Sequence, residues 1–90
     1  MKRTIITVLG HDCVGIIARV CTYLADNGIN ILDISQTITG GFFNMMMITD
    51  TSGCSKTTGE IADELDQIGK TMNLSIRCMQ EEIFDNMHRI

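Results

Sequence analysis

The segment Gly10-His11-Asp12-Cys13-Val14-Gly15 decides how this chain folds, because it joins a strand-like run directly to a helical pattern. Before it, residues Thr4 to Leu9 are rich in β-branched residues and apolar on both faces, which is typical of a central strand covered on two sides. From Val14 on, the period changes to that of an amphipathic helix. The predicted core positions are Ile16, Ile17, Val20, Cys21 and Leu24, with Arg19, Tyr23, Asp26 and Asn27 on the opposite face.

The next signals predict a β-hairpin after this helix. Gly28 supplies the left-handed position that closes a helix, and the runs Ile29 to Thr39 and Phe42 to Asp50 are strand-like. Gly40-Gly41 between them is a two-residue turn of the type that needs positive φ. The apolar positions change parity along the first of these strands, which predicts a β-bulge near Asp33.

A second helix, a strand and a short third helix complete the pattern. Thr57 followed by Glu60 forms a capping box that starts the second helix. Residues Asn73 to Met79 alternate, which predicts an edge or semi-exposed strand. The core stripe of the second helix is Ile61, Leu65, Ile68 and Met72, and the apolar side of the C-terminal helix is Ile83, Phe84, Met87 and Ile90.

The order βαββαβ predicts an α+β fold of one domain, residues 1–90. Right-handed crossovers give a ferredoxin-like sandwich, in which a four-stranded antiparallel sheet carries two helices on one face, with the short C-terminal helix added. The hairpin has large apolar residues on both faces: Phe43, Met45 and Met47 on one, Phe42, Met46 and Ile48 on the other. Only one set can meet the two helices. We therefore expect the C-terminal helix, a second subunit or both to cover the other set, and predict a homodimer formed through sheet edges or through this face.

Composition restricts the class of partner. Eleven acidic and seven basic residues give a net charge of −4, which disfavours nucleic acid and anionic membranes. No run resembles a signal peptide or a membrane span. The four cysteines have neither C-x-x-C pairing nor zinc-type spacing, so we expect reduced thiols and a cytoplasmic protein.

The first turn and the start of the following strand are the candidate binding site, because a helix N-terminus and a polar Asn could be brought to one edge of the sheet. The N–H groups of Gly15 and Ile16 suit a carboxylate, and Asp12 or Asn30 suits an ammonium group. Each residue also has a structural interpretation: Asp12 as N-cap, Gly15 as relief of crowding, and Asn30 as a partner of turn backbone. The predicted ligand-binding residues are His11, Asp12, Cys13, Val14, Gly15, Ile16, Asn30 and Ile31.

We predict no catalytic residue, metal or cofactor. His11 and Cys13 flank Asp12, but three adjacent residues point in divergent directions and no second cluster completes a metal site. The same pair lacks the spacing of a nucleophile and its base.

The sequence resembles that of the ACT domain family. The resemblance rests on the βαββαβ order, on Gly10 to Ala18, and on Gly28-Ile29-Asn30-Ile31 with Asp33 to Gln36. Over its whole length the chain resembles the free-standing UPF0237 proteins, which are similar in form to the glycine-cleavage regulator. The resemblance implies a regulatory domain that dimerises, binds an amino acid at the subunit boundary, and signals through another protein.

The alternatives come from other classes of protein. A ligand-free protein interaction module would keep the same fold and dimer. An acylphosphatase-like enzyme would need an Arg in the first loop, and residues 10 to 15 contain none. An RNA-binding domain of this topology would need a basic sheet with aromatic positions, whereas this chain is acidic.

Overall fold

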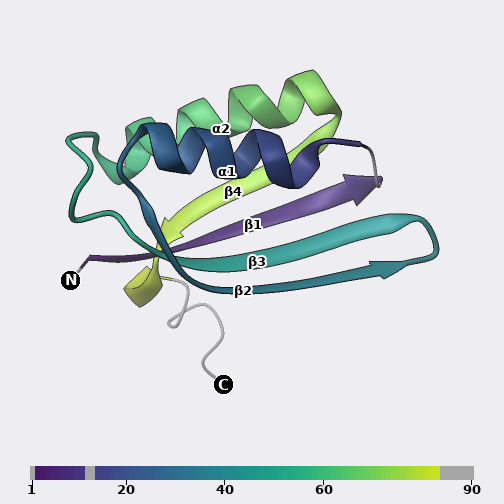
Figure 1. Ribbon diagram of the computed structural model, residues 1–90, viewed down its shortest axis with the longest axis horizontal. Coiled ribbons are helices and arrows are strands. Elements are labelled where there is room, and N and C mark those ends of the chain that lie inside the picture. The colour runs from purple at the N-terminus through teal and green to yellow at the C-terminus, as the bar shows by residue number, and fades with distance from the viewer. Residues whose placement is uncertain (1, 12–13, 84–90) are drawn as a thin grey trace.

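The computed structural model describes residues 2–11 and 14–83 and shows one sheet with two helices on the same face (Figure 1). Its elements are β1 (Arg3–His11), α1 (Ile16–Asp26), β2 (Asn30–Thr39), β3 (Phe42–Asp50), α2 (Thr58–Met72) and β4 (Leu74–Gln80), with a helical turn at residues 81–83. The strands pair antiparallel in the order β2-β3-β1-β4. The predicted ferredoxin-like α+β fold is confirmed, with β1 central and with β2 and β4 at the edges.

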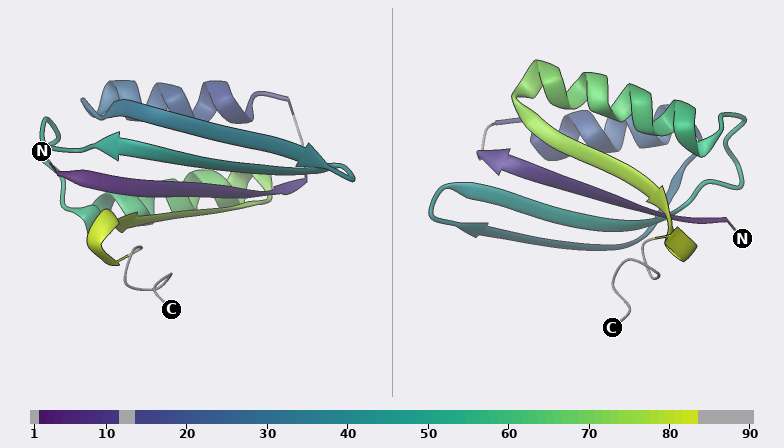
Figure 2. Two further views of the ribbon diagram at one scale, coloured as in Figure 1. Left: turned by 90° about the horizontal axis from the view of Figure 1, so that it is seen from below. Right: turned by 180° about the vertical axis from the view of Figure 1, so that it is seen from behind.

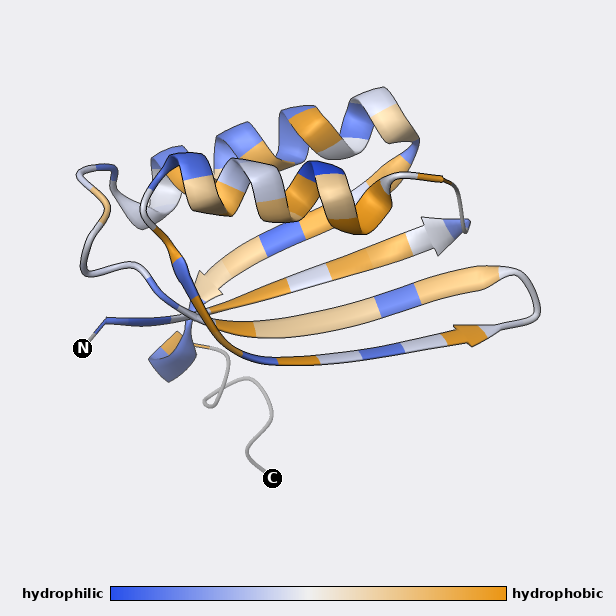
Figure 3. Cartoon of the chain, viewed as in Figure 1, coloured by the Kyte–Doolittle hydropathy of each residue, from blue (hydrophilic) through white to orange (hydrophobic). Residues whose placement is uncertain are grey.

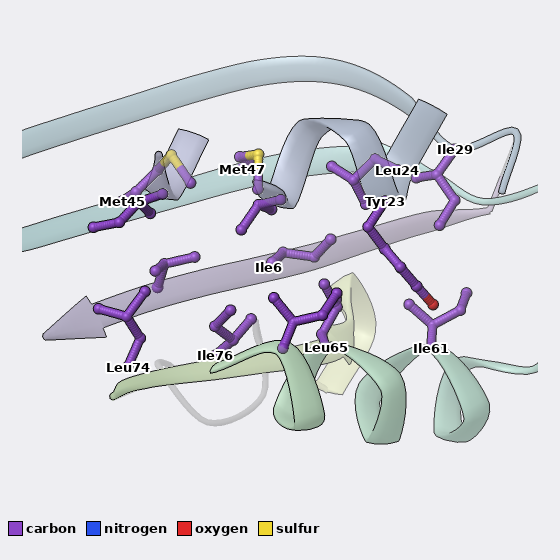
Figure 4. Packing of buried hydrophobic residues seen from close by; sticks show 14 of the residues in the cluster. Ile6, Tyr23, Leu24, Ile29, Met45, Met47, Ile61, Leu65, Leu74 and Ile76 are labelled. Carbon is purple, nitrogen blue, oxygen red and sulfur yellow. The ribbon is translucent and has the colours of Figure 1, made fainter. Parts of the chain in front are cut away.

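The core lies between the helices and one face of the sheet (Figure 4). Ile6 and Val8 of β1 are fully buried, and directly opposite them Met47 and Met45 of β3 are also fully buried. Ile61 and Leu65 of α2 are also fully buried and point from the helix into the core. Figure 3 shows apolar and polar segments alternating along both helices, whose buried residues include Val20 and Leu24 of α1 and Ile61 and Leu65 of α2. Burying such side chains supplies about 1.5–3 kcal/mol each, so this layer is the main source of stability.

Several local predictions are confirmed. Gly28 and the pair Gly40 and Gly41 adopt positive φ, as their turns require. The pairing of β2 with β3 shifts register between Ile31 and Asp33, which is the predicted bulge. The sequence left open which face of the hairpin meets the helices: it is that of Phe43, Met45 and Met47, which are buried, whereas Phe42 and Met46 lie on the opposite face and are exposed.

The first turn is shorter than predicted. Gly10 and His11 belong to β1, because they pair with Leu74 of β4 and Phe42 of β3. Helix α1 begins at Ile16 rather than Val14. Pairing with distant strands, which the local sequence does not predict, lengthens β1 and shortens the turn.

The predicted burial of two residues of α1 is wrong. Ile17, predicted in the core, is 41% exposed, and Tyr23, predicted on the polar face, is only 9% exposed. The reason is that α1 lies beside α2, so its buried stripe is rotated towards that helix (Figure 4). Tyr23 extends across the gap and its hydroxyl donates a hydrogen bond to Oε1 of Glu64, at 2.7 Å.

Lys56, Glu64 and Tyr23 form a polar cluster at the edge of the core. Nζ of Lys56 lies 2.6 Å from the same Glu64 oxygen and 5.8 Å from the centre of the Tyr23 ring. Burial, followed by the hydrogen bond to Glu64, raises the pKa of Tyr23. Hydrogen bonds from Lys56 and then Tyr23 lower the pKa of Glu64. The cluster therefore holds the loop before α2 against both helices.

The predicted C-terminal helix is confirmed as a short helical turn at residues 81–83, where Ile83 is half exposed. Its other predicted contact residues, Phe84, Met87 and Ile90, lie outside the described residues. Seen from below in Figure 2, the sheet face away from α1 and α2 is otherwise open among the described elements.

Substituting Thr57 tests the capping box at the start of α2. The Thr57 side chain accepts a hydrogen bond from the Glu60 N–H at 3.1 Å, and the Glu60 side chain accepts from the Thr57 N–H at 3.2 Å. Thr57→Ala should lower the free energy of unfolding by about 1 kcal/mol in urea denaturation. The matched control is Thr58→Ala, because within the described chain the buried Thr58 hydroxyl has no hydrogen-bond partner. An equal loss in both variants would contradict the capping role.

Substituting Tyr23 tests the polar cluster through its pH dependence. Tyr23→Phe should cost about 0.5–1.5 kcal/mol at pH 7, because Glu64 keeps Lys56 as a partner. A raised folded pKa means that the tyrosine's contribution is complete below its unfolded pKa of 10.0 and declines as pH rises towards the folded value. The difference in free energy of unfolding between the parent and the variant, measured in urea, should therefore be smaller at about pH 10.5 than at neutral pH. If this difference in free energy is the same at both pH values, the fold does not hold Tyr23 protonated.

Candidate functional site

The described part of the first turn offers exposed backbone at the start of α1. Val14 is fully exposed and Gly15 is exposed, whereas Ile16 is 2% exposed and belongs to the core. His11 ends β1 on the open face of the sheet, where its ring stacks on Phe42 with a centroid separation of 4.5 Å and an interplanar angle of 27°. The predicted residues Asp12 and Cys13 lie outside the described residues.

Gly15 is the N-cap of α1, so the capping position predicted for Asp12 is occupied by a residue further along the chain. Gly15 has φ 89°, in the left-handed region that side-chain-bearing residues disfavour. A Cβ at position 15 would meet nothing within 4 Å, so the glycine does not relieve crowding. The left-handed backbone conformation is the reason that this position favours glycine. The first N–H groups of α1 have no intrahelical acceptor, as in any helix, and Gly15 has no side chain that could cap them. This end of α1 can therefore accept an anion.

Asn30 begins β2 with an exposed side chain. The turn before it is completed by other groups: the Asn27 side-chain amide donates to the Tyr23 carbonyl at 2.8 Å, and the Ile29 N–H donates to the Leu24 carbonyl at 2.9 Å. Among the described residues, no hydrogen bond joins the Asn30 side chain to that turn. Ile31, the other residue predicted here, is half-buried and packs against the core.

A carboxylate lies directly across from Asn30. Asp50 is its partner in the β2–β3 register, and it accepts hydrogen bonds from the Ser52 hydroxyl, the Ser52 N–H at 3.0 Å and the Lys2 N–H at 3.3 Å. The Ser52 hydroxyl is the largest cause of a lowered Asp50 pKa. The carboxylate therefore stays ionised at neutral pH.

The first turn and Asn30 lie at opposite ends of the sheet within one chain. His11 pairs with Phe42 at the hairpin end, whereas Asn30 pairs with Asp50, which in turn pairs with Arg3 at the far end of β1. Eight residues of extended strand separate these ends, which corresponds to about 27 Å at ~3.4 Å per residue. In Figure 1, the turn before α1 and the start of β2 lie at opposite ends of β1. One chain therefore does not bring the predicted residues to one edge.

The described residues contain little that could support other chemistry. Within residues 2–11 and 14–83, no three His, Cys, Asp or Glu side chains gather as they would around a metal ion. Cys21, Cys54 and Cys78 are free thiols, and burial raises the pKa of Cys78 to about 11. A surface depression lies at the Arg3 end of β1, lined by Lys2, Arg3, Gln80, Glu81 and Glu82. No helix in the described part of the chain is long and apolar enough to cross a membrane.

Two features of this region were not found from the sequence. The stacking of His11 on Phe42 depends on the β1–β3 register, for which the sequence holds no local signal. The second feature is the exposure of Ile34 and Ile38 on the helix side of β2, at 43% and 60%. The sequence shows that Ile34 and Ile38 lie on one face of the strand. It does not show that this strand lies at the edge of the sheet, where that face is only partly covered.

Comparison with known proteins identifies the family. The model of the ACT domain family matches residues 2–79. A UPF0237 protein of Bifidobacterium longum is 54% identical over 90 residues, covering all of both chains. A solved ACT domain protein from Streptococcus pneumoniae is 35% identical, with a TM-score of 0.81, and the match covers 92% of this chain and 93% of that one.

A more distant structure shares the fold alone. A structure assigned to a glycine cleavage system transcriptional repressor has a TM-score of 0.74 and 22% identity. The match covers 88% of this chain and 45% of that one, so the same fold also occurs as part of a longer chain. Together, the strand order, the family model and the full-length identity show that this chain belongs to the ACT domain family, among the UPF0237 proteins.

Proposed function

We propose that this protein is a regulatory domain that forms a homodimer and binds a small amino acid at the boundary between the two subunits. The first turn of one subunit would hold the carboxylate, and the Asn30 region of the other would hold the ammonium group. The occupied dimer would then signal through a partner protein, without catalysis of its own and in the cytoplasm, where its free thiols remain reduced.

One observation carries this proposal: the two halves of the predicted site lie at opposite ends of a single sheet. Among the described residues, the α1 N-terminus supplies N–H donors, and the Asn30 end supplies a side-chain carbonyl beside the ionised Asp50. A zwitterion needs both a donor site and an acceptor site, and a second subunit would bring these two ends together.

Among the described residues, no hydrogen bond joins the Asn30 side chain to its turn, which favours a role in ligand binding over a structural role. A residue that only stabilises its turn should hydrogen-bond to that turn, and in this structure Asn27 and the backbone fulfil that task. The remaining alternative is a ligand-free interaction module with the same fold. Amino-acid binding distinguishes the two functions.

A thermal-shift screen of the twenty amino acids, followed by calorimetry, tests the proposed ligand. A ligand that binds only the folded dimer must raise its melting temperature. The hit should lose binding when its carboxylate is converted to an amide or its amine is acetylated, because either change removes one of the two charges. If no amino acid binds at millimolar concentration, roughly the weakest useful affinity, the interaction module is the better account.

Asn30→Ala tests the residue roles. It should weaken binding about ten- to hundredfold, since a hydrogen bond to a charged group is worth about 1.5–3 kcal/mol. Unfolding in urea should change little, because the Asn30 side chain is exposed. The matched control is Gln67→Ala, which removes an exposed amide from α2. If Asn30→Ala melts lower yet binds as the parent does, the residue has a structural role only.

Gly15→Val tests the first turn. Valine is β-branched and disfavours the left-handed φ of 89° strongly, so the start of α1 should be displaced and binding should fall. A folded variant with unchanged affinity would exclude the α1 N-terminus as the carboxylate site.

A further inference from the structure

We propose that the C-terminal segment of this chain, residues 84–90, packs as a helix on the open face of the sheet, against Leu9 and Met46. This segment lies outside the described residues and follows the helical turn at residues 81–83. It would cover the apolar part of the face that α1 and α2 leave uncovered (Figure 2). Neither an amino-acid ligand nor a second subunit takes part in this contact.

The apolar residues of the open face are unequally exposed. Ile5 lies on this face, between Ile48 of β3 and Met79 of β4, and is only 4% exposed. Leu9, on the same face of β1, is 53% exposed, and Met46 of β3 is 37% exposed. Side chains stand roughly perpendicular to a sheet, so flanking residues alone leave the tip of a side chain in contact with solvent. The burial of Ile5 therefore indicates that chain covers this end of the open face.

The chain turns onto the open face directly after β4. In Figure 1, the helical turn at residues 81–83 lies on the side of the sheet opposite α1 and α2. Arg3 is on the same face of β1 as Ile5, and its Nη1 lies 3.5 Å from Oε2 of Glu81. Residues 84–90 therefore begin at the covered end of the face, beside the uncovered part.

The sequence of the segment suits a helix lying on an apolar surface. At about 100° per residue, Ile83, Phe84, Met87 and Ile90 fall within an arc of about 120° around a helix. Every other residue of the segment is polar. A helix with one apolar stripe is stable only when that stripe is buried against another element.

The length of the segment matches the distance to be covered. Leu9 is four positions beyond Ile5 along β1, which corresponds to about 14 Å at ~3.4 Å per residue. A helix over residues 83–90 rises about 10 Å, and its side chains extend beyond its ends. The segment would thus reach Leu9 and Met46. Phe42 lies two positions further along, where it stacks on His11 instead.

The uncovered apolar patch has the width of a single helix. It belongs to the two inner strands, β1 and β3, which lie about 4.8 Å apart, whereas a helix with its side chains is about 10 Å wide. The outer strands present polar residues on this face: Asp33, Ser35, Thr37 and Thr39 of β2, and Ser75 and Arg77 of β4. A narrow apolar strip between polar strands suits a helix better than a broad protein surface.

The competing occupant is a second copy of this chain. A stable interface with another protein needs about 800 Å² from each partner, so it would have to bury the polar outer strands as well. The C-terminal segment is already attached at the edge of the patch. Attachment gives it an effective concentration on the order of millimolar, whereas a free copy is available only at its concentration in solution. Covalent connection therefore favours the segment.

Contacts between methyl groups of the full chain test the packing directly. With isotope-labelled Met and Leu methyl groups, Met87 should show nuclear Overhauser effects to Leu9 or Met46, because packed side chains lie within about 4.5 Å. The matched control is Met72 of α2, which packs against the core on the other face and should show none to Met87. Mixing two differently labelled samples separates contacts within a chain from contacts between chains. Absence of these effects, or their appearance only between chains, would overturn the proposal.

A charge on the apolar stripe tests the cover through methionine oxidation. Met87→Asp should release the segment, because burying a carboxylate against apolar residues is costly. Dilute hydrogen peroxide converts accessible methionine to its sulfoxide, so Met46 should be oxidised several-fold faster than in the parent, as measured by peptide mass. The matched control, His88→Asp, places the same carboxylate outside the stripe and should leave the rate unchanged. Met45 and Met47 are fully buried and should stay protected in both variants, which checks the fold.

Two outcomes of the oxidation experiment would contradict the proposal. Equal oxidation of Met46 in the parent and in a folded Met87→Asp variant would show that the segment does not cover the face. Oxidation of Met46 that slows as the protein concentration rises, to the same extent in both variants, would assign the face to a second copy. Both experiments are carried out without amino acids, so their result is independent of the proposed ligand.

Discussion

β1 is paired on both sides, with β3 and with β4, and the rest of the molecule takes its position from those two ladders. The register that sets Ile6 against Met47 and Val8 against Met45 places one apolar face under both helices. A shift of one residue would turn these side chains to the open face and expose the core. The same register sets His11 beside Phe42, so the position of the first turn follows from core packing.

The antiparallel sheet separates the residues that the sequence places close together. The helix that follows the first turn returns along the sheet, so β2 starts at the opposite end from the turn. The N-terminus of α1 and the Asn30–Asp50 pair therefore lie at opposite ends of a single chain. In the proposed function, a second subunit brings these two ends together around one ligand.

The two edge strands are covered to different extents. A chain of 90 residues buries only about 60–65% of the surface that its unfolded form exposes, so apolar side chains remain at the rim of its core. β4 is covered by α2 and shorter than β2, whereas β2 extends with the hairpin beyond the helices (Figure 1). The exposed isoleucines of β2 are thus a consequence of where α1 begins.

The sequence alone determined the elements whose signals are local. The capping box at Thr57, the turn at Gly40-Gly41, the bulge at Asp33 and the parity of Met45 and Met47 each depend on neighbouring residues, and the structure has them as predicted. The tertiary structure decided what depends on contacts between distant segments. Strand pairing moved Gly10 and His11 from the turn into β1, and packing between helices buried Tyr23 and exposed Ile17. The placement of Asn30 far from the first turn belongs to the same class, because strand direction and order are fixed only when the sheet assembles.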